Sequence, residues 1–416
     1  MVSRTSMFRS IVEHAHNSIK GKTSALKNIP NTTGSNYSKF DQLTNGQKIE
    51  VLSAIKSLKS YETNSKGVNE RRKELFKKMS WTQQNLGEKV GYLQKLKSID
   101  KAIDTNQKFI DDVANYAVSN YGVSQKDFEL LENESSNSSG NNYRVIEALG
   151  HYTRDWTPNN ISLELLPIFE YIASQLEMLI DYRQKKDTVL VFPGSGLGRL
   201  AYEFAKWDYG AVYSVENSGL MNLFVDFNYS NNTKPYTIHP YIHTNSDFYN
   251  TKSQLRTFEY KPIGETNKPE SLHIAQKDFT QFEIPDRDKY KNVVIVSVFF
   301  LDTAENLFNY LDTIGKLAKP SGNVERGYWI NAGPLKYGSA AQVELNADEL
   351  AEARKNLGWV DAQSVYTIYD PLSLGNKTGL VGYLTDKESM WQGYYGLNLF
   401  TTSRKENKSY KDTTLG

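Results

Sequence analysis

The stretch TVLVFPGSGLGRL, residues 188–200, decides the fold that this sequence predicts. Its first five residues are apolar or β-branched, which is typical of a short buried strand. Gly194, Gly196 and Gly198 follow at alternate positions, and glycine permits the positive φ angles and the close backbone approach that a ligand-binding turn needs. Helical spacing begins directly afterwards. The loop therefore lies at the start of a helix, where free N–H groups can face a ligand.

Strands and helices continue to alternate on the carboxyl side of this stretch. The segments 211–215, 273–275, 292–300, 327–332 and 393–402 have the composition of strands. Helical spacing lies between them, most clearly at 304–317. Such alternation predicts an α/β fold with a parallel sheet and helices on both faces. In such sheets, ligands bind beyond the carboxyl ends of the strands.

An acidic residue, Glu216, ends the second predicted strand, where it can accept both ribose hydroxyls of an adenosine. Phosphate-binding loops have the spacing Gly-x-Gly-x-x-Gly. Here the third glycine comes one residue early, and Arg199 stands in its usual place. This spacing favours S-adenosylmethionine, which has no phosphate, over a nicotinamide dinucleotide. A glycine turn without a ligand is the weaker interpretation.

Two further acidic residues follow strands of the predicted sheet. Asp278 can hold an adenine amino group while Phe279 lies beside the base, and a turn aspartate next to a core phenylalanine is an equally good interpretation. Asp302 follows the strongest strand and precedes a helix. It can face a ligand at this edge or cap the helix, and its position alone slightly favours the cap.

The part of the chain before the α/β pattern has a different texture. Residues 1–45 are polar and predict a flexible arm, 46–130 predict a helical region, and 131–143 form a low-complexity linker. We expect the α/β domain to cover 144–404, followed by a polar tail at 405–416.

Composition narrows the classes of function. The chain has 416 residues with 49 Lys and Arg against 48 Asp and Glu, and this balance gives no general electrostatic reason to bind nucleic acid or an anionic membrane. The absence of cysteine excludes disulfides, cysteine nucleophiles and cysteine-ligated zinc. The longest apolar run, 293–301, is far shorter than the ~20 residues of a membrane helix. We see no secretory signal and expect a cytoplasmic protein, with the nucleus left open as a second compartment.

A metal site is the weakest expectation from these residues. His239 and His243 could ligate zinc, but no acidic or cysteine partner stands nearby at metal-ligand spacing. We therefore expect no metal, and a packed ring or the wall of a binding site for each histidine.

Several longer motifs carry a resemblance to a known family. They are Arg154-Asp155-Trp156, residues 193–201, 241–243, 278–280, 299–304 and 329–335, and Tyr394-Tyr395. Through them the chain, from about residue 55 to 404, resembles the carnosine N-methyltransferase family. The resemblance implies a Rossmann-like class I methyltransferase sheet, with an N-terminal helical region. It also implies methyl transfer from S-adenosylmethionine to an imidazole nitrogen of carnosine (β-alanyl-histidine), giving anserine.

The resemblance also implies roles for single residues. It assigns to the cofactor His151, Arg154, Gly194, Gly196, Glu216, Asp278, Phe279 and Val298, with Arg154 on the cofactor's carboxylate. It assigns to the substrate Asp302, His243, Tyr394 and Tyr395. For catalysis we expect Asp302, with Tyr337 or Tyr395, because the family's usual histidine is missing. The partner is then a small molecule rather than nucleic acid or a membrane, and a homodimer is left open.

Three positions depart from the family pattern. Gly338 stands where the family usually has a histidine that handles the imidazole proton, Gly393 replaces the first tyrosine of a triplet, and His151 replaces a glutamine. Two of these changes lie on the substrate side. Methylation of another imidazole compound or of a peptide or protein histidine, and cofactor binding without catalysis, are therefore the alternatives. A nicotinamide dehydrogenase is the weakest one.

Overall fold

The computed structural model describes residues 39–133, 142–156, 161–366 and 380–404. The polar tail, most of the polar arm and most of the low-complexity linker lie outside the described residues. The chain forms two compact units, and their limits are not continuous in sequence. The first unit comprises residues up to Asn160, Gly219–Glu265 and Asp386–Trp391, and the second comprises Ile161–Ser218, Thr266–Thr385 and the residues from Gln392. The boundary expected between the helical region and the α/β domain stays a prediction.

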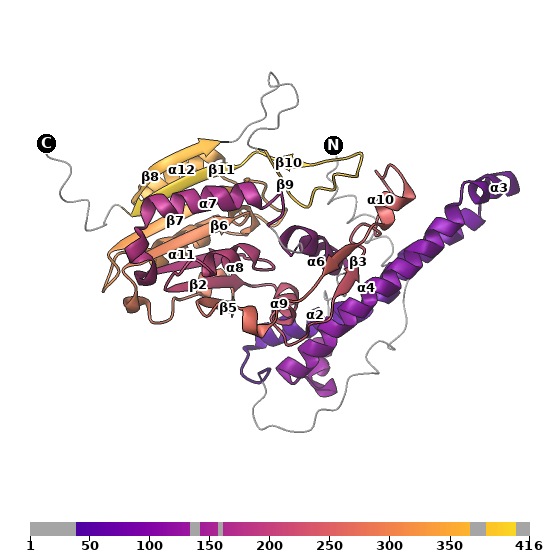
Figure 1. Cartoon of the computed structure of the whole chain (residues 1–416), viewed down its shortest axis with the longest axis horizontal. Helices are drawn as coiled ribbons and strands as arrows, with labels where there is room; N and C mark the ends of the chain where they lie inside the picture. Colours follow the sequence, from indigo (N-terminus) through magenta and orange to yellow (C-terminus); the bar gives the residue numbers. More distant parts are fainter. Residues whose placement is uncertain (1–38, 134–141, 157–160, 367–379, 405–416) are drawn as a thin grey trace, which may run out of the picture. The chain divides into compact units, whose positions relative to one another are not determined.

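The second unit is built on one seven-stranded sheet with the order β5-β2-β1-β6-β7-β11-β8 (Figure 1). The strands from β5 to β7 are parallel, whereas β11 runs antiparallel between β7 and β8. This sheet confirms the predicted Rossmann-like class I fold. The strand bounds are β1 (Thr188–Pro193), β2 (Ala211–Glu216), β5 (Leu272–Gln276), β6 (Asn292–Val298), β7 (Arg326–Gly333), β8 (Trp359–Tyr366) and β11 (Asn398–Arg404).

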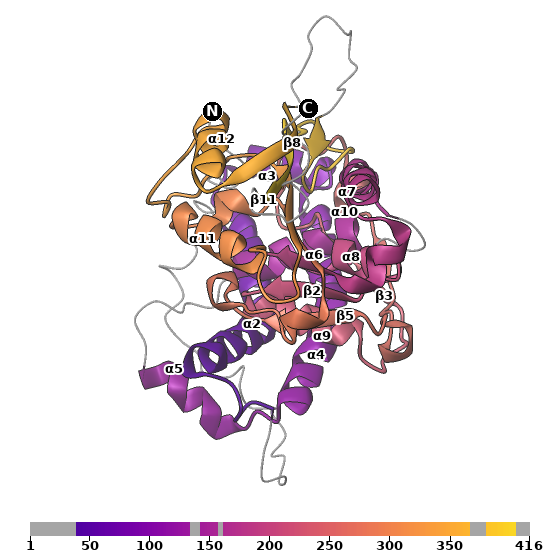
Figure 2. The same ribbon diagram turned by 90° about the vertical axis from the view of Figure 1, so that its left-hand side faces the viewer.

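Helices cover both faces of this sheet, as predicted (Figure 2). Alternate side chains of β1 point to opposite faces because successive residues of a strand do so. Val189 and Val191 join the apolar core that includes Leu311, whereas Phe192 stacks on Phe204 with 5.8 Å between ring centroids. Leu311 lies on α11 (Leu307–Leu317), and Leu350 of α12 (Ala347–Asn356) joins the same core. Phe204 lies on α8 (Arg199–Ala205), and its ring contacts that of Phe169 on α7 (Leu166–Leu179).

Short elements connect these strands and helices. They are the 3₁₀ helices η2 (Tyr182–Asp187), η4 (Phe279–Gln281), η5 (Arg287–Lys289) and η6 (Leu301–Thr303), and the antiparallel pair β9 (Val381–Gly382) and β10 (Tyr394–Tyr395). The 3₁₀ helix η3 (Glu265–Asn267) lies where the chain passes from the first unit to the second.

The first unit is mainly helical. Its elements are α2 (Asn45–Lys77), α3 (Trp81–Lys89), α4 (Tyr92–Tyr121), η1 (Gln125–Phe128), α5 (Glu129–Asn133), α6 (Asn142–Asp155), α9 (Gly219–Asn228), α10 (Thr251–Leu255) and the antiparallel pair β3 (Tyr236–Ile238) and β4 (Phe258–Tyr260). Thr44 and Gln47 form a capping box that starts α2. The rings of Tyr152, Phe224, Phe227, Tyr236 and Tyr260 lie 5.0–5.9 Å from that of Phe109 and form its aromatic core.

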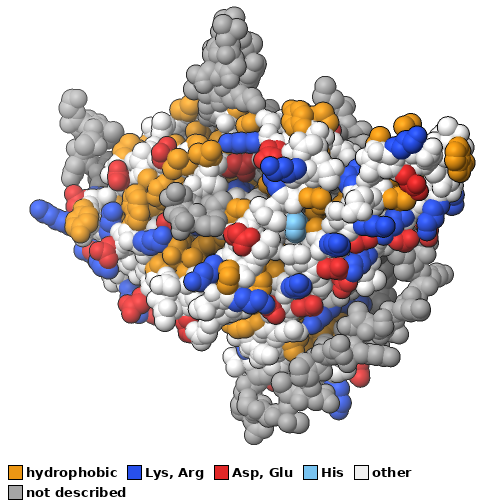
Figure 3. All heavy atoms as spheres, turned by 45° about the vertical axis from the view of Figure 1, so that its right-hand side comes forward, with side chains coloured by type: hydrophobic (Ala, Val, Ile, Leu, Met, Phe, Trp, Pro, Cys, Tyr) orange, Lys and Arg blue, Asp and Glu red, His pale blue; other side chains and the backbone are white. Residues whose placement is uncertain are grey.

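The surface shows no concentration of one charge on the face drawn in Figure 3, where Lys and Arg side chains are interspersed with Asp and Glu. This pattern agrees with the net charge of +1. Among the described residues, none of the helices combines the length and the apolar character that crossing a bilayer requires.

Candidate functional site

The glycine loop after β1 is fixed by hydrogen bonds to Glu216, the last residue of β2. Gly194, Gly196 and Gly198 have φ angles of 59°, 56° and 76°, so each occupies the left-handed region that glycine adopts without strain. The N–H of Gly196 donates to Glu216 Oε2 at 2.8 Å, and the N–H of Ser218 donates to Oε1 of the same carboxylate at 2.8 Å. Glu216 therefore fixes the loop between β1 and α8, in addition to its predicted role on a ribose.

The glycines of this loop differ in what surrounds them. A Cβ at Gly194 would lie 2.4 Å from the ring of Phe300, whereas a Cβ at Gly196 would meet nothing within 4 Å. The space beside Gly196 is thus open at the carboxyl edge of the sheet, where the predicted cofactor would approach the backbone. The residues present fit an adenosyl ligand without a phosphate.

Burial raises the pKa of the Glu216 carboxyl, while the N–H groups of Ser218 and Gly196 act in the opposite direction. An ionised carboxylate has about four lone-pair sites, so it can accept ribose hydroxyls as well as backbone N–H groups.

Asp278 and Phe279 follow β5 in the turn that forms η4. Asp278 Oδ1 accepts the N–H and the hydroxyl of Thr280, both at 2.8 Å, and Phe279 is buried with its ring 5.4 Å from that of Phe300. These contacts account for a turn aspartate and a core phenylalanine. Their predicted contact with adenine stays a prediction.

Asp302 lies in η6, immediately after β6, and it does not cap the following helix. Asn306 is the N-cap of α11, and its side chain accepts the N–H of Phe308 at 3.1 Å. The helix-cap interpretation of Asp302 is therefore wrong, because Asp302 lies in a 3₁₀ turn that ends before the cap residue Asn306. Instead, Asp302 Oδ2 accepts the N–H of Lys336 at 3.0 Å, which ties the loop after β6 to the loop after β7. Burial raises the pKa of the Asp302 carboxyl to about 6.

Phe299 has an unusual backbone conformation beside Asp302. Its φ angle is 47°, in the left-handed region that a bulky side chain rarely adopts. Its N–H donates to the carbonyl of Ala332 at 3.0 Å, and a Cβ at Gly333 would lie 3.0 Å from the Phe299 nitrogen. The glycine after Ala332 thus allows β7 to hold the strained residue, and strain of this kind concentrates at binding sites.

An aromatic cluster surrounds the side chain of Phe299. Its ring centroid lies 4.9 Å from that of Tyr383 and 6.1 Å from that of Tyr395. The Tyr395 hydroxyl accepts a hydrogen bond from Lys336 Nζ at 3.2 Å. Asp302, Lys336 and Tyr395 are therefore linked. Sequence reasoning assigned no role to Lys336 or Tyr383; the only signal for Lys336 was its place between Leu335 and Tyr337 in a family motif.

The other predicted residues of the second unit have local partners. The Tyr337 hydroxyl donates to the carbonyl of Leu345 at 2.8 Å, and burial raises its pKa to about 12, so the phenol stays protonated. The Tyr394 hydroxyl donates to Gln392 Oε1 at 3.3 Å. Val298 ends β6 opposite Ala332.

The remaining predicted cofactor residues lie on α6 of the first unit. Arg154 donates to both carboxylate oxygens of Asp155, with Nε to Oδ1 at 2.5 Å and Nη2 to Oδ2 at 3.1 Å. His151 is buried, and burial, aided by the Arg154 charge, lowers its pKa to about 3. Its ring is therefore neutral at physiological pH.

His243, a predicted substrate residue, belongs to a buried network of the first unit. Its Nε2 lies 2.7 Å from the hydroxyl of Tyr61, which accepts from Asn106 Nδ2 at 3.0 Å. Because that hydroxyl accepts from Asn106, its own proton can be donated to His243. Burial lowers the pKa of His243 to about 3. These contacts stabilise the first unit, and a contact between His243 and substrate stays a prediction.

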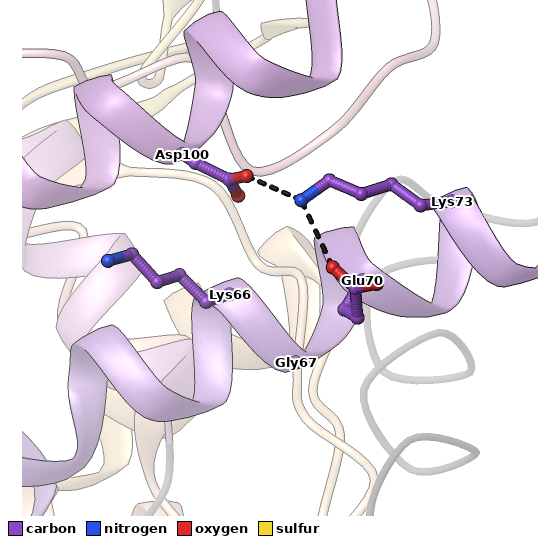
Figure 4. Close-up of a pocket in the computed structure, with 5 residues that line it drawn as sticks. All are labelled: Lys66, Gly67, Glu70, Lys73 and Asp100. Carbon is purple, nitrogen blue, oxygen red and sulfur yellow. Dashed lines mark hydrogen bonds and ion pairs between the residues drawn. The ribbon is translucent and has the colours of Figure 1, made fainter. Parts of the chain in front are cut away.

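A cavity of about 350 Å³ in the first unit lies between α2 and α4 (Figure 4). Lys73 Nζ lies 2.6 Å from Asp100 Oδ2 and 3.1 Å from Glu70 Oε2, and Lys66 pairs with Glu62 at 2.6 Å. Each lysine that lines the cavity pairs with a carboxylate, so the cavity offers no unpaired lysine to a ligand. Within the described residues, no three metal-binding side chains gather in one place.

Comparison with known proteins identifies the family of this chain. The profile described as carnosine N-methyltransferase matches residues 132–406. An uncharacterized protein of Saccharomyces cerevisiae is 31% identical over 346 residues, which are 75% of this chain and 72% of that protein. Carnosine N-methyltransferase of Schizosaccharomyces pombe is 25% identical over 359 residues (83% and 92%), and that of Mus musculus is 26% identical over 317 residues (75% of each).

Among solved structures, magnesium protoporphyrin IX methyltransferase from Synechocystis PCC 6803 with bound SAH aligns with 63% of this chain and 99% of its own, at 11% identity and a TM-score of 0.34. The family profile covers well over half of the chain, and the glycine loop lies inside the matched region. The protein therefore belongs to the carnosine N-methyltransferase family and is an N-methyltransferase that depends on S-adenosylmethionine.

Proposed function

We propose that this enzyme transfers the methyl group to an imidazole nitrogen of carnosine, giving anserine. The observation that supports this best is the half-buried Asp302 carboxylate at the carboxyl edge of the sheet, held by the N–H of Lys336. A neutral imidazole has a lone pair on one nitrogen and a proton on the other. A carboxylate that accepts a hydrogen bond from this N–H keeps the proton on that nitrogen. The other nitrogen, with its lone pair, is then the one free to react.

S-adenosylmethionine supplies the methyl group on a sulfonium, which becomes a neutral thioether when the ring nitrogen takes the methyl. The ring becomes cationic in that step, and the Asp302 carboxylate stabilises the developing charge. With a pKa of about 6, Asp302 is ionised at neutral pH and can afterwards take the ring proton or pass it to water.

The acceptor is a small molecule, and the homodimer and the cytoplasmic or nuclear location remain predictions from the sequence.

A second candidate is the methylation of another imidazole compound or of a histidine in a peptide. Gly338 is exposed, and a Cβ there would meet nothing within 4 Å. The position where the resemblance expects a proton-handling histidine is therefore open space, which favours a less restricted acceptor.

Incubation with isotope-labelled S-adenosylmethionine and carnosine tests the proposal. We expect one labelled methyl group on one imidazole nitrogen, identified by mass spectrometry and NMR. Label on free histidine or a histidine peptide but not on carnosine would favour the second candidate. Binding of S-adenosylhomocysteine with no turnover of any imidazole compound would show a protein that binds the cofactor without catalysis.

The pH dependence should reveal Asp302. Because its pKa is raised to about 6, the carboxyl gains a proton as the pH falls through that value and loses the negative charge that stabilises the cationic ring. The acceptor imidazole also protonates, near a pKa of about 6.5. At saturating cofactor, kcat/KM should therefore fall roughly a hundredfold per pH unit on the acid side, since two protons are involved. In Asp302→Asn the residual activity should fall only about tenfold per unit. The same slope in both enzymes would contradict this assignment.

A further inference from the structure

Lys336 contacts Asp302, on which the proposed chemistry depends, and Tyr395, a predicted catalytic residue. Its backbone N–H donates to Asp302 Oδ2 at 3.0 Å, and its Nζ donates to the Tyr395 hydroxyl at 3.2 Å. The Nζ also lies 5.6 Å from the centroid of the Tyr395 ring, so the side chain folds along this ring. A fixed positive charge therefore lies within one side-chain length of the Asp302 carboxylate.

The positive charge of Lys336 has no ion-pair partner among the described residues. Lys336 is exposed, and among the described residues no carboxylate lies within ion-pair distance of its Nζ. Other exposed lysines of the second unit do have such partners, for example Lys355 with Glu352 at 3.5 Å and Lys316 with Asp312 at 2.5 Å. Among the described residues, the Lys336 ammonium donates a hydrogen bond only to this neutral hydroxyl, and its charge also lowers the pKa of Asp302, which leaves N–H donors for an anion.

We propose that Lys336 is a specificity-determining residue that binds a carboxylate of the acceptor. This inference rests on the proposed function and narrows its substrate class. The acceptors are imidazole compounds with a carboxylate on the carbon next to the ring's methylene group, as in a C-terminal histidine.

The arrangement of charges explains why such a molecule fits. Asp302 attracts the ring N–H and repels a carboxylate, whereas Lys336 attracts the carboxylate. A molecule that carries both groups a few bonds apart can satisfy both residues in one orientation only, and like-charge contacts disfavour the reverse orientation. Lys336 would thus help to decide which ring nitrogen faces the cofactor, without touching the reacting atoms.

The test compares two substrates that share the same ring, carnosine and its decarboxylated analogue β-alanylhistamine. We expect the wild-type enzyme to favour carnosine, mainly through KM. In Lys336→Met, kcat/KM for carnosine should fall roughly ten- to hundredfold more than that for β-alanylhistamine, the range for one charge-assisted hydrogen bond. Lys336→Arg should keep the preference. Lys355→Met, a lysine on α12, is the matched control and should behave as wild type.

Two outcomes would overturn the inference. One is an equal loss on both substrates in Lys336→Met, which would show a structural role for this side chain. The other is a wild-type enzyme that uses both substrates equally, which would leave the proposed function standing.

Calorimetry with S-adenosylhomocysteine-loaded protein keeps the test independent of turnover. Carnosine should bind more tightly than β-alanylhistamine, and this difference should disappear in Lys336→Met. If neither compound is methylated and carnosine still shows this Lys336-dependent preference, the proposed reaction fails while the carboxylate site stands. If the preference is absent as well, both fail.

Discussion

Asp302→Asn is expected to lower kcat by about a hundred- to a thousandfold, the range found when a group that stabilises transition-state charge is removed. Asparagine has nearly the same shape and can still accept the N–H of Lys336 through its amide oxygen. It lacks the negative charge that stabilises a cationic ring. The change therefore removes the electrostatic contribution and leaves the connection between the loops after β6 and β7 in place.

Single-turnover measurements at saturating cofactor would check this expectation, with S-adenosylhomocysteine affinity as the test of an intact cofactor site. Glu305→Gln is the matched control, because it removes an exposed carboxylate three residues along the same loop. Activity of Asp302→Asn within a few-fold of wild type would rule out the proposed role of the carboxylate.

Gly194→Ala is expected to damage the cofactor site more than its single added methyl group suggests. The φ angle of 59° would cost an alanine about 1–2 kcal/mol. The new Cβ would also lie 2.4 Å from the Phe300 ring. That ring cannot move easily, since it is buried and stacks on Tyr310 with 4.4 Å between centroids. Overpacking of this kind costs roughly another 1–3 kcal/mol.

Urea denaturation and S-adenosylhomocysteine binding would measure both effects. We expect the free energy of unfolding to fall by about 2–5 kcal/mol, the sum of the two costs, and the affinity for S-adenosylhomocysteine to fall more than about tenfold, because the displaced loop carries Gly196. Gly358→Ala separates the two costs. Gly358 has a φ angle of 81° and open space around a Cβ, so it should lose only the conformational part and keep its cofactor affinity. If both variants lose the same free energy of unfolding and the same affinity, the Phe300 ring moves aside without cost and the overpacking argument fails.

The part of the site that sequence reasoning predicted well is the part that local patterns encode. An apolar strand, alternate glycines and a helix lie within thirteen consecutive residues, 188–200, and the predicted strand and helix are present as β1 and α8. Glu216 ends β2 as expected, since the period of a strand and the chemistry of a turn can be read from neighbouring residues.

The acceptor side depends on loops that meet from distant parts of the chain. Lys336 and Tyr395 are 59 residues apart, and Tyr395 is placed by the short pairing of β10 with β9. No local pattern specifies that pairing, so Tyr383 went unnoticed. For Asp302 the local signal was ambiguous, because an aspartate before a helix is a normal cap, and only the structure shows that Asn306 has that role.

The same limit applies to the first unit. The helical spacing after the second predicted strand, 211–215, indicated a helix but not its neighbours. In the structure α9 belongs with α2, and a Cβ at Gly219 would lie 2.8 Å from the backbone of Glu50. Periodicity shows that a helix has a buried face, whereas the identity of the covering element depends on the tertiary fold.

The position of β11 has a consequence for biosynthesis. This strand, Asn398–Arg404, is the last one described, yet it lies inside the sheet between β7 and β8. While the ribosome is still making it, β7 and β8 expose unpaired edges, which are prone to join other chains. Residues that pair across long stretches of sequence also fold slowly. The nascent protein should therefore depend on chaperones until β11 has been translated.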